Sequence, residues 1–286
     1  MEFSPLHDDF GAEVRGVDLT QTPEPETIDA LHQAIDEYSV LLFREQPMSD
    51  AAHMALTEAL GEPEESHVAF GRTGEIVYIG TIGNVVDATT KRDDAHPHTQ
   101  SQKGNNLWHS DSSFRLVPSY VSILHAYEVP PVGGDTEFVS QRAAYDRLSA
   151  SRQAEIADLR VLHDYVFSRS KAALVHDNHA ASLPPIEQKL VRVNPRHGRP
   201  NYFVGSHARS IVGWSGIESR RLIDELNDHA TQPENRWVQK WRPGDTLIWD
   251  NRCVLHCGAG YDANQYRRLL RQSRVRGQGP TLAEQP

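Results

Sequence analysis

The sequence predicts a mainly β fold, in which a β-sandwich or barrel carries a few helices on its outside. Many short apolar segments are separated by turns rich in Gly and Pro, and only a few segments have helical spacing. The chain has 286 residues, of which 38% are hydrophobic and 24% charged, as in an ordinary globular domain. Because no repeat, low-complexity tract or change of composition divides it, we expect one domain over residues 1–286.

Helices are expected where apolar residues recur at helical spacing, in residues 24–38, 50–61, 141–159 and 215–231. In the second of these, Asp50 is a candidate N-cap and Gly61 a candidate stop. Strands are expected in the short apolar segments, at residues 39–46, 74–85, 119–129, 135–140, 190–194, 201–205, 236–241, 246–250 and 266–275. Residues 87–106 are polar and follow neither period, so we expect a long loop that acts as a lid.

Charge and composition exclude several classes of protein. The net charge of −10 and a pI of about 5.8 come without a sustained basic stripe, so we expect no nucleic-acid partner. No segment approaches the roughly 20 apolar residues that a membrane-spanning helix needs. The start of the chain lacks the cationic and apolar regions of a signal peptide, and the two cysteines give no disulfide framework. We therefore expect a cytoplasmic protein, and we expect it to form a homo-oligomer.

The segment "NLWHSDSSF", residues 106–114, holds an imidazole and a carboxylate two positions apart, His109 and Asp111. In an extended segment, residues i and i+2 point to the same face, so both side chains could reach one point. That point could be a metal ion, a proton in transit or nothing. A His-x-Asp pair alone is weak evidence for any of them.

A second histidine sharpens the prediction. The segment "PGDTLIWDNRCVLHCGAGYD" presents His256 at the edge of an apolar strand. Two His and one carboxylate form a facial triad for non-haem Fe(II), which leaves coordination positions open for a bidentate ligand and dioxygen. Cys253 and Cys257 flank His256 and could resemble a zinc site. However, no second Cys/His pair stands at a zinc spacing.

Arginines follow this histidine on the last predicted strand, in "QYRRLLRQSRV". Alternation would place Arg267, Leu269 and Arg271 on one face. A buried arginine is costly unless it meets an anion, and its fork pairs well with a carboxylate. A 2-oxo acid with a distal carboxylate would satisfy both the metal triad and Arg267.

With these residues the chain resembles the taurine / 2,4-dichlorophenoxyacetate dioxygenase family of Fe(II)- and 2-oxoglutarate-dependent oxygenases. The matching stretches span nearly the whole chain: "FGAEVRGVDL", "SVLLFREQPMS", "NLWHSDSSF", "PPVGGDTEFVSQRAAYDRL", "FVGSHA" and "PGDTLIWDNRCVLH" with the Arg at +11. The wording "WHSDSSF" and "GGDTEF" looks closest to the aryloxyalkanoate branch. The last strand, ending "RQSRV", also looks like members that hydroxylate N-acylated amino acids. The resemblance implies a double-stranded β-helix, a cupin-like jelly roll whose open end holds the iron.

The resemblance implies three sets of site residues. The iron ligands are His109, Asp111 and His256. The residues around 2-oxoglutarate are Thr136, Arg267 and Trp249. The residues around the substrate are Arg271 and His207.

The reaction implied is a dioxygenation that uses Fe(II), 2-oxoglutarate and O2 and yields succinate and CO2. Its expected substrate is a small organic anion, in which a C–H bond is hydroxylated. If the hydroxylated carbon carries an ether oxygen, the hemiacetal product collapses and the ether is cleaved. The carboxylate of Asp111 favours oxygenation over halogenation, which needs that ligand replaced. The alternatives are a hydroxylase or desaturase of an amino-acid-derived natural product, a non-catalytic metal- or small-molecule-binding β-barrel, and a protein hydroxylase.

Overall fold

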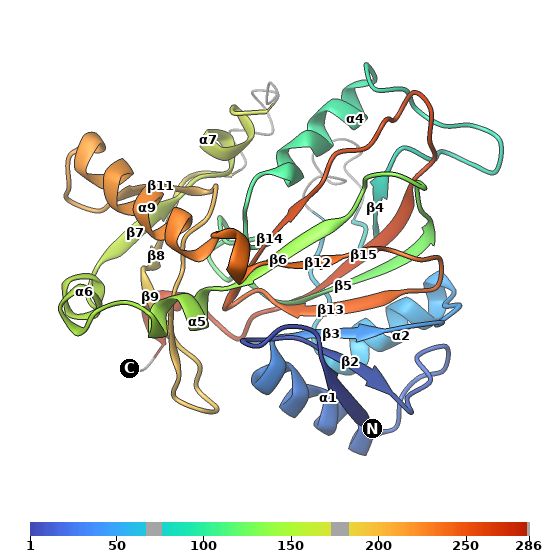
Figure 1. Ribbon diagram of the computed structural model, residues 1–286, viewed down its shortest axis with the longest axis horizontal. Coiled ribbons are helices and arrows are strands. Elements are labelled where there is room, and N and C mark those ends of the chain that lie inside the picture. Colours follow the sequence, from blue (N-terminus) through green and yellow to red (C-terminus); the bar gives the residue numbers. More distant parts are fainter. Residues whose placement is uncertain (67–75, 173–182, 285–286) are drawn as a thin grey trace.

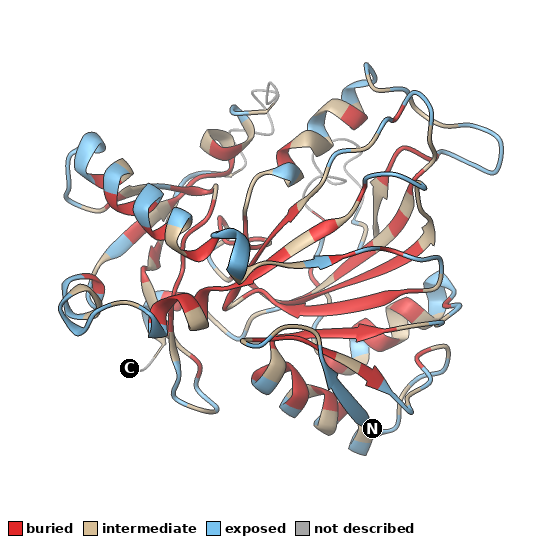
Figure 2. Ribbon diagram, viewed as in Figure 1, coloured by how far each residue is buried: buried red, intermediate tan, exposed pale blue. Residues whose placement is uncertain are grey.

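The structure is a computed structural model in which residues 1–66, 76–172 and 183–284 are described. It confirms the mainly β fold with flanking helices (Figure 1). Two sheets, of seven and three strands, contribute side chains to a shared apolar core and form the jelly roll. Strands of both sheets are largely buried, whereas the outer face of α9 is exposed (Figure 2).

The large sheet has the strand order β1-β2-β3-β13-β5-β15-β4. Its members are β1 (Glu2–Pro5), β2 (Ala12–Arg15), β3 (Val40–Phe43), β13 (Thr246–Asp250), β5 (Ser119–Glu128), β15 (Leu269–Arg276) and β4 (Gly80–Gly83). All neighbours pair antiparallel except β2 and β3. Every residue of β13 is buried, because strands flank it on both sides. The unbroken apolar run "TLIW" is typical of such a central strand.

The small sheet has the order β12 (Trp237–Gln239), β6 (Thr136–Ser140) and β14 (Val254–Gly258). Phe138 and Val254 from this sheet share a buried cluster with Leu124, Trp249 and Leu270 from the large one. The two sheets therefore face each other, and the segments that leave this core form one end of the roll.

Helices α1 (Pro25–Tyr38) and α2 (Asp50–Leu60) cover the outer face of the large sheet (Figure 1). In α1, Ile28, Leu31 and Ile35 lie on one helical face and are buried against the sheet. The N-cap of α2 is Ser49, whose hydroxyl accepts from the amide of Ala52, and not Asp50 as expected. The helix ends at Gly61 as predicted. There φ is +147°, and a Cβ would lie 2.8 Å from a Val275 methyl.

A second group of elements packs around its own buried cluster beside the roll. It contains α5 (Gln141–Asp146), α6 (Ala150–Ile156), β7 (Arg160–His163), α7 (Tyr165–Arg169), β8 (Ile186–Lys189), β9 (Val191–Val193), β10 (Pro200–Tyr202), β11 (Ala208–Ile211) and α9 (Gly216–Ala230). The short 3-10 helices η2 (Pro233–Asn235) and η3 (Thr281–Ala283) complete the described elements outside residues 87–106. The helix expected over residues 141–159 is two helices, because Ser149 caps the second by accepting from the amide of Arg152.

The segment expected to be an irregular lid contains α4 (Pro97–Gln102) and η1 (Lys103–Asn106). Its start is tied to the turn that precedes β15, because the Lys91 ammonium donates to the carbonyls of Ala263 and Asn264. The strand expected over residues 74–85 is β4, which is shorter; residues 74 and 75 lie outside the described part. Sequence periodicity missed α4 because a helix of six residues is too short to show it.

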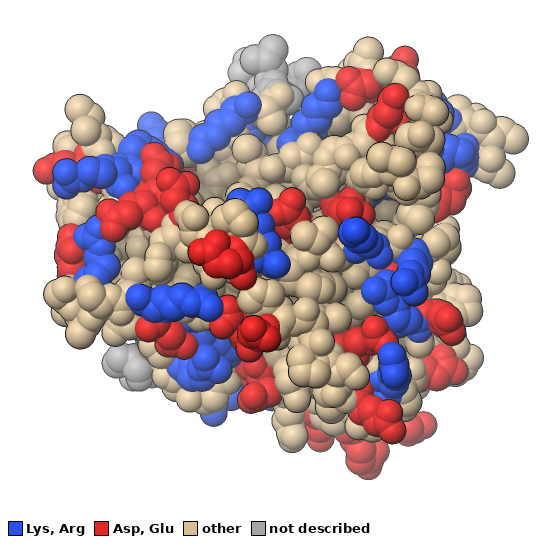
Figure 3. All heavy atoms as spheres, viewed as in Figure 1, with Lys and Arg blue, Asp and Glu red and all other residues tan. Residues whose placement is uncertain are grey.

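Two further expectations concern the surface. Within the described ranges, none of the helices has the length and hydropathy to span a bilayer. On the face seen in Figure 3, Lys and Arg side chains are interspersed with Asp and Glu.

Candidate active site

A cavity of about 610 Å³ is lined by residues from both sheets, from α4 and η1, and from α7. We call it the active-site cavity. Its volume lies within the roughly 300–1,000 Å³ typical of small-molecule sites. His109, Asp111 and His256 all line it, so the residues that the sequence singled out first lie together on its wall.

Backbone pairing brings the two histidines together. His256 belongs to β14, and His109 forms an isolated antiparallel bridge with it. Each amide donates to the carbonyl of the other residue, at 2.9 Å in both directions. Asp111 follows in a turn in which Ser112 has φ +54°, so the pair reaches one point without lying in a regular strand.

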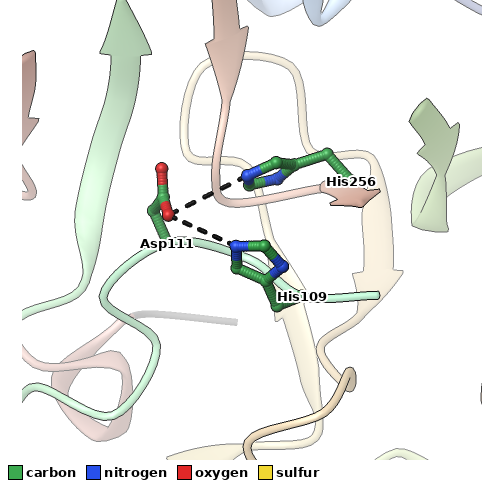
Figure 4. Close-up of side chains that lie close together, drawn as sticks. All are labelled: His109, Asp111 and His256. Carbon is green, nitrogen blue, oxygen red and sulfur yellow. Dashed lines mark ion pairs between the residues drawn. The ribbon is translucent and has the colours of Figure 1, made fainter. Parts of the chain in front are cut away.

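The three side chains converge on one position (Figure 4). Asp111 Oδ1 lies 3.6 Å from Nε2 of His109 and 3.9 Å from Nε2 of His256. One ligand atom from each residue lies within 4.8 Å of the others. Donors bound at right angles to one metal ion, each about 2.1 Å away, stand about 3 Å apart, so small shifts would close this set around an ion.

The hydrogen bonds leave the converging atoms available. Nδ1 of His109 lies 2.6 Å from the Leu107 carbonyl, which can only accept. The proton of that ring is therefore on Nδ1, and Nε2 has a free lone pair. The other carboxylate oxygen of Asp111, Oδ2, accepts from the Ser122 hydroxyl at 2.6 Å and from the Gln272 amide at 2.8 Å. These two donors fix the carboxylate so that Oδ1 faces the histidines.

Electrostatics favour the metal-binding protonation states. Burial lowers the pKa of His109, although the Asp111 charge opposes this shift. Burial, with the neighbouring His109, lowers the pKa of His256 to about 3. Burial disfavours the ionised form of Asp111, but the interactions with His256 and Arg274 outweigh it and bring its pKa to about 2. Two neutral imidazoles and one carboxylate are the donor set of a non-haem Fe(II) site.

The flanking cysteines do not join this set. Cys253 and Cys257 are buried thiols, and burial raises the pKa of each, to about 11 and about 12. The metal-ligand group in the described residues consists of His109, Asp111 and His256 alone.

Three other predicted site residues lie on the cavity wall. Thr136 is buried at the start of β6, and its hydroxyl accepts from the Trp241 indole at 3.0 Å, which leaves its proton to donate. The Trp249 ring centroid lies 4.7 Å from that of His256, so this aromatic is beside the metal ligands as expected. His207 is buried, and its ring stands edge-on to His109 at 6.0 Å.

Arg267 does not face the active-site cavity, so the expected face of the last strand is wrong. Its guanidinium pairs with Glu128, with Nε 2.7 Å from Oε2 and Nη2 3.0 Å from Oε1, and the side chain is 28% exposed. Leu270, Gln272 and Arg274 of β15 turn toward the core and the cavity, and regular alternation places Arg268, just before the strand, on the same side. Alternation read from sequence separates Arg267 from Arg268 but does not tell which of the two faces turns inward.

Arg268, which sequence reasoning missed, is the arginine in the position expected of Arg267. It is 6% exposed, lines the cavity and donates to the Gly134 carbonyl, two residues before Thr136. Within the described residues it forms no ion pair, and its buried Nε has no hydrogen-bond partner. Burial lowers its pKa to about 10, so it is a cation at neutral pH. The signal available was its position next to Arg267 in "YRRLL".

Arg271 lines the cavity, but its guanidinium is already paired with a carboxylate of the protein. Its guanidinium bonds both oxygens of Asp50, at 3.1 and 2.7 Å, and donates to the Thr81 hydroxyl at 2.6 Å. A substrate anion would have to displace Asp50.

A family model described as "Taurine catabolism dioxygenase TauD, TfdA family" matches residues 2–273. The chain belongs to this family. The resemblance predicted from the sequence motifs is therefore confirmed.

Similar TauD/TfdA proteins extend over almost the same length. The chain is 38% identical over 274 residues to an alpha-ketoglutarate-dependent 2,4-dichlorophenoxyacetate dioxygenase of Cupriavidus pinatubonensis, covering 94% of this chain and 95% of that one. It is 33% identical to an (S)-phenoxypropionate/alpha-ketoglutarate-dioxygenase of Sphingobium herbicidovorans, covering 96% and 95%. The crystal structure of AAD-2 in complex with Mn(II) and N-oxalylglycine has a TM-score of 0.90 and 35% identity, covering 99% and 100%.

The chain is thus an enzyme, a 2-oxoglutarate-dependent non-haem iron dioxygenase. Fe(II), 2-oxoglutarate and O2 are its cofactor and cosubstrates, and the buried His–Asp–His group suits the metal.

Proposed function

We propose that residues 1–286 form one dioxygenase domain that hydroxylates an aryloxyalkanoate anion at the carbon beside its ether oxygen. The relatives named for dichlorophenoxyacetate and phenoxypropionate support this substrate class. The observation that carries the proposal is the composition of the cavity wall. A buried His–Asp–His group stands next to aromatic rings and to arginines without an acidic partner in the described chain.

The overall reaction balances with one molecule of each reactant. Substrate R–H, O2 and 2-oxoglutarate give R–OH, succinate and CO2. When bound, Fe(II) supplies the activation of O2 that this oxidation requires. At a carbon bonded to an ether oxygen, R–OH is a hemiacetal, which breaks down to a phenol and an aldehyde or ketone.

In this proposal His109, Asp111 and His256 hold the metal, and two neighbours hold Asp111. Because Ser122 and Gln272 both donate to Oδ2, the carboxylate can offer Oδ1 to the metal without rotating. Such outer-shell donors fix ligand orientation and commonly affect metal affinity by about 10- to 100-fold.

The 2-oxoglutarate molecule is proposed to lie between the metal and Arg268. The guanidinium of Arg268 and the hydroxyl of Thr136 would bind its distal carboxylate, and Trp249 would form the adjacent wall. The motive is that Arg268 is buried, cationic and without an ion pair in the described chain, which is costly unless an anion binds there. Arg268 takes the role that the sequence suggested for Arg267.

Residues 87–106 are proposed to act as the lid of the site. Gln102, Asn105 and Asn106 line the cavity from α4 and η1, so this segment is one of its walls. Closing it over bound substrate would exclude water from the reacting C–H bond.

The test is turnover of purified protein with Fe(II), ascorbate, 2-oxoglutarate and (2,4-dichlorophenoxy)acetate. Succinate and 2,4-dichlorophenol should form in equal amounts, and Asp111→Ala should form neither. Turnover of N-acylated amino acids but of no aryloxy acid would contradict the substrate class. Absence of succinate with every small anion tested would contradict the assignment of these residues to catalysis. The homo-oligomeric state and the cytoplasmic location stay predictions.

A further inference from the structure

The described residues place six basic side chains on the wall of the active-site cavity: Arg92, Lys103, Arg169, Arg268, Arg271 and Arg274. Three of them have acidic partners in the protein. Lys103 pairs with Asp94 at 3.0 Å, Arg271 with Asp50 at 2.7 Å and Arg274 with Glu64 at 3.0 Å.

Two of the other three lie at the end assigned to 2-oxoglutarate. Asn84 connects them, because its side chain accepts from the amide of Arg268 and its carbonyl accepts from the amide of Arg92. The last cation, Arg169, is at the end of α7 and comes from the other group of elements. It therefore faces the cavity from a different direction.

Arg169 forms no ion pair with any described residue. Its Nη2 donates to the Asn105 side chain at 2.9 Å, and its Nη1 makes a long contact of 3.5 Å with the Ser101 carbonyl. Its Nε is buried and has no hydrogen-bond partner in the described chain. The guanidinium is thus held by neutral oxygens and keeps donor capacity for an anion.

Gly104 provides a close-fitting cradle for this guanidinium. A Cβ on Gly104 would lie 2.1 Å from Nη1, 2.8 Å from Cδ and 2.9 Å from Cζ of Arg169. Gly104 lies in η1 with ordinary right-handed backbone, so its conformation does not require glycine. The close approach of Arg169 does require it, and any side chain here would displace the guanidinium.

Aromatic rings lead from Arg169 to the metal ligands. The guanidinium carbon of Arg169 lies 5.4 Å from the Tyr165 ring centroid, and Tyr165 packs on Phe114 at 4.8 Å. Phe114 lies 4.9 Å from His207, whose ring is the one edge-on to His109. A ligand with an aryl ring and an anionic group finds both complements on this wall.

We propose that Arg169, positioned by Gly104, binds the anionic group of the substrate; this rests on the proposed function. The net charge of −10 repels small anions in general, which makes a local cation inside the cavity more effective at selecting them. Arg271 then has a structural role through Asp50, and the substrate anchor comes from α7 and not from the last strand.

The test measures binding to the protein loaded with Mn(II) and N-oxalylglycine, by calorimetry, without turnover. The ligands are (2,4-dichlorophenoxy)acetate and its neutral amide. Arg169→Leu should weaken binding of the acid roughly ten- to a hundred-fold and change binding of the amide less than about threefold. Gly104→Ala should weaken the acid selectively as well, by about three- to tenfold. Arg220→Leu is the matched control, because Arg220 lies over the Phe167 ring of α7 but outside the cavity lining.

An unchanged Kd for the acid in Arg169→Leu would overturn the inference, as would equal losses for acid and amide. So would a selective loss in Arg271→Leu with none in Arg169→Leu. Unchanged N-oxalylglycine affinity and unfolding midpoint show that each variant is folded. If the wild-type protein binds neither acid nor amide, the substrate class has failed separately. A panel of simple anions from phenylacetate to ethyl sulfate then tests Arg169. If none of these anions binds in a way that depends on Arg169, its proposed role is refuted.

Discussion

Replacing Arg268 by leucine should have opposite effects on the free protein and on its ligand complex. In the free protein the guanidinium is buried without an ion pair in the described chain, and burial lowers its pKa from 12.5 to about 10. A shift of that size corresponds to roughly 3 kcal/mol against the charged form, at about 1.36 kcal/mol per pKa unit. Removing the guanidinium relieves this cost in the free protein, but the variant also loses the hydrogen bond to Gly134, which offsets about 1 kcal/mol of the gain.

The ligand complex should lose affinity instead. A charge-assisted pair with a carboxylate contributes about 1.5–3 kcal/mol, so Arg268→Leu should raise the Kd of N-oxalylglycine roughly ten- to a hundred-fold. Arg268→Lys keeps the charge but loses the bidentate geometry of the guanidinium, so its Kd for N-oxalylglycine should lie between those of wild type and Arg268→Leu. Ligand-free Arg268→Leu should unfold at an equal or higher temperature than the wild-type protein, while the stabilisation by saturating ligand shrinks.

The assay is thermal unfolding with Mn(II), with and without N-oxalylglycine, together with calorimetric titration. Arg267→Leu is the matched control on the adjacent residue, because its guanidinium pairs with Glu128 outside the cavity. It should bind N-oxalylglycine within about twofold of wild type. The reasoning is refuted if Arg268→Leu binds the ligand normally, or if Arg267→Leu is the variant that loses it.

Three other results are expected. His109→Ala should reduce Mn(II) affinity in calorimetry, because one of three converging donors is lost; wild-type affinity would remove this residue from the metal site. Trypsin should cleave within residues 87–106 of the free enzyme, as mapped by mass spectrometry, and more slowly with Mn(II), N-oxalylglycine and substrate; equal rates would argue against a lid. Burial, reinforced by the neighbouring His125 and Arg271 and opposed by Asp50, lowers the pKa of His53 to about 4. The neutral imidazole therefore contributes stability to the folded protein above pH 6.5, and this contribution is lost as the pH falls toward 4. In urea unfolding, the free energy of unfolding of His53→Gln should fall less than that of wild type between pH 6.5 and 4, by up to about 3 kcal/mol. An identical pH profile for the two proteins would contradict the role given to His53.

The metal site could be predicted from sequence because its residue types are chemically restrictive. Two histidines and a carboxylate within named motifs leave few alternatives, and the structure brings them together. The geometric reason was only partly right, however. His109 meets His256 through a single bridge and Asp111 follows in a turn, so strand alternation does not position this pair.

The arginines could not be assigned because their register depends on tertiary structure. The sequence offers Arg267 and Arg268 side by side, and a shift of one residue exchanges the two faces of a strand. The choice depends on which face of β15 turns inward, and that is set by its pairing with β5, which is distant in sequence. Arg169 was not a candidate either, since its contact with Gly104 joins segments 65 residues apart.

Local signals would have improved two of the secondary-structure predictions. Ser49 and Ser149 are N-caps whose hydroxyls accept from the third following amide, and serine is a favoured residue at that position. Ser49 takes the N-cap position of α2 that was expected at Asp50, and Ser149 begins a second helix within the helix expected over residues 141–159.

A crystal structure of the protein with Mn(II) and N-oxalylglycine would show directly which residues bind the metal and which bind the distal carboxylate. We expect anomalous density for one metal ion bound by Nε2 of His109, Oδ1 of Asp111 and Nε2 of His256. We also expect the distal carboxylate of N-oxalylglycine on the guanidinium of Arg268 and the hydroxyl of Thr136. A metal bound elsewhere, or a carboxylate on Arg267 or Arg271 with Arg268 unengaged, would contradict these assignments.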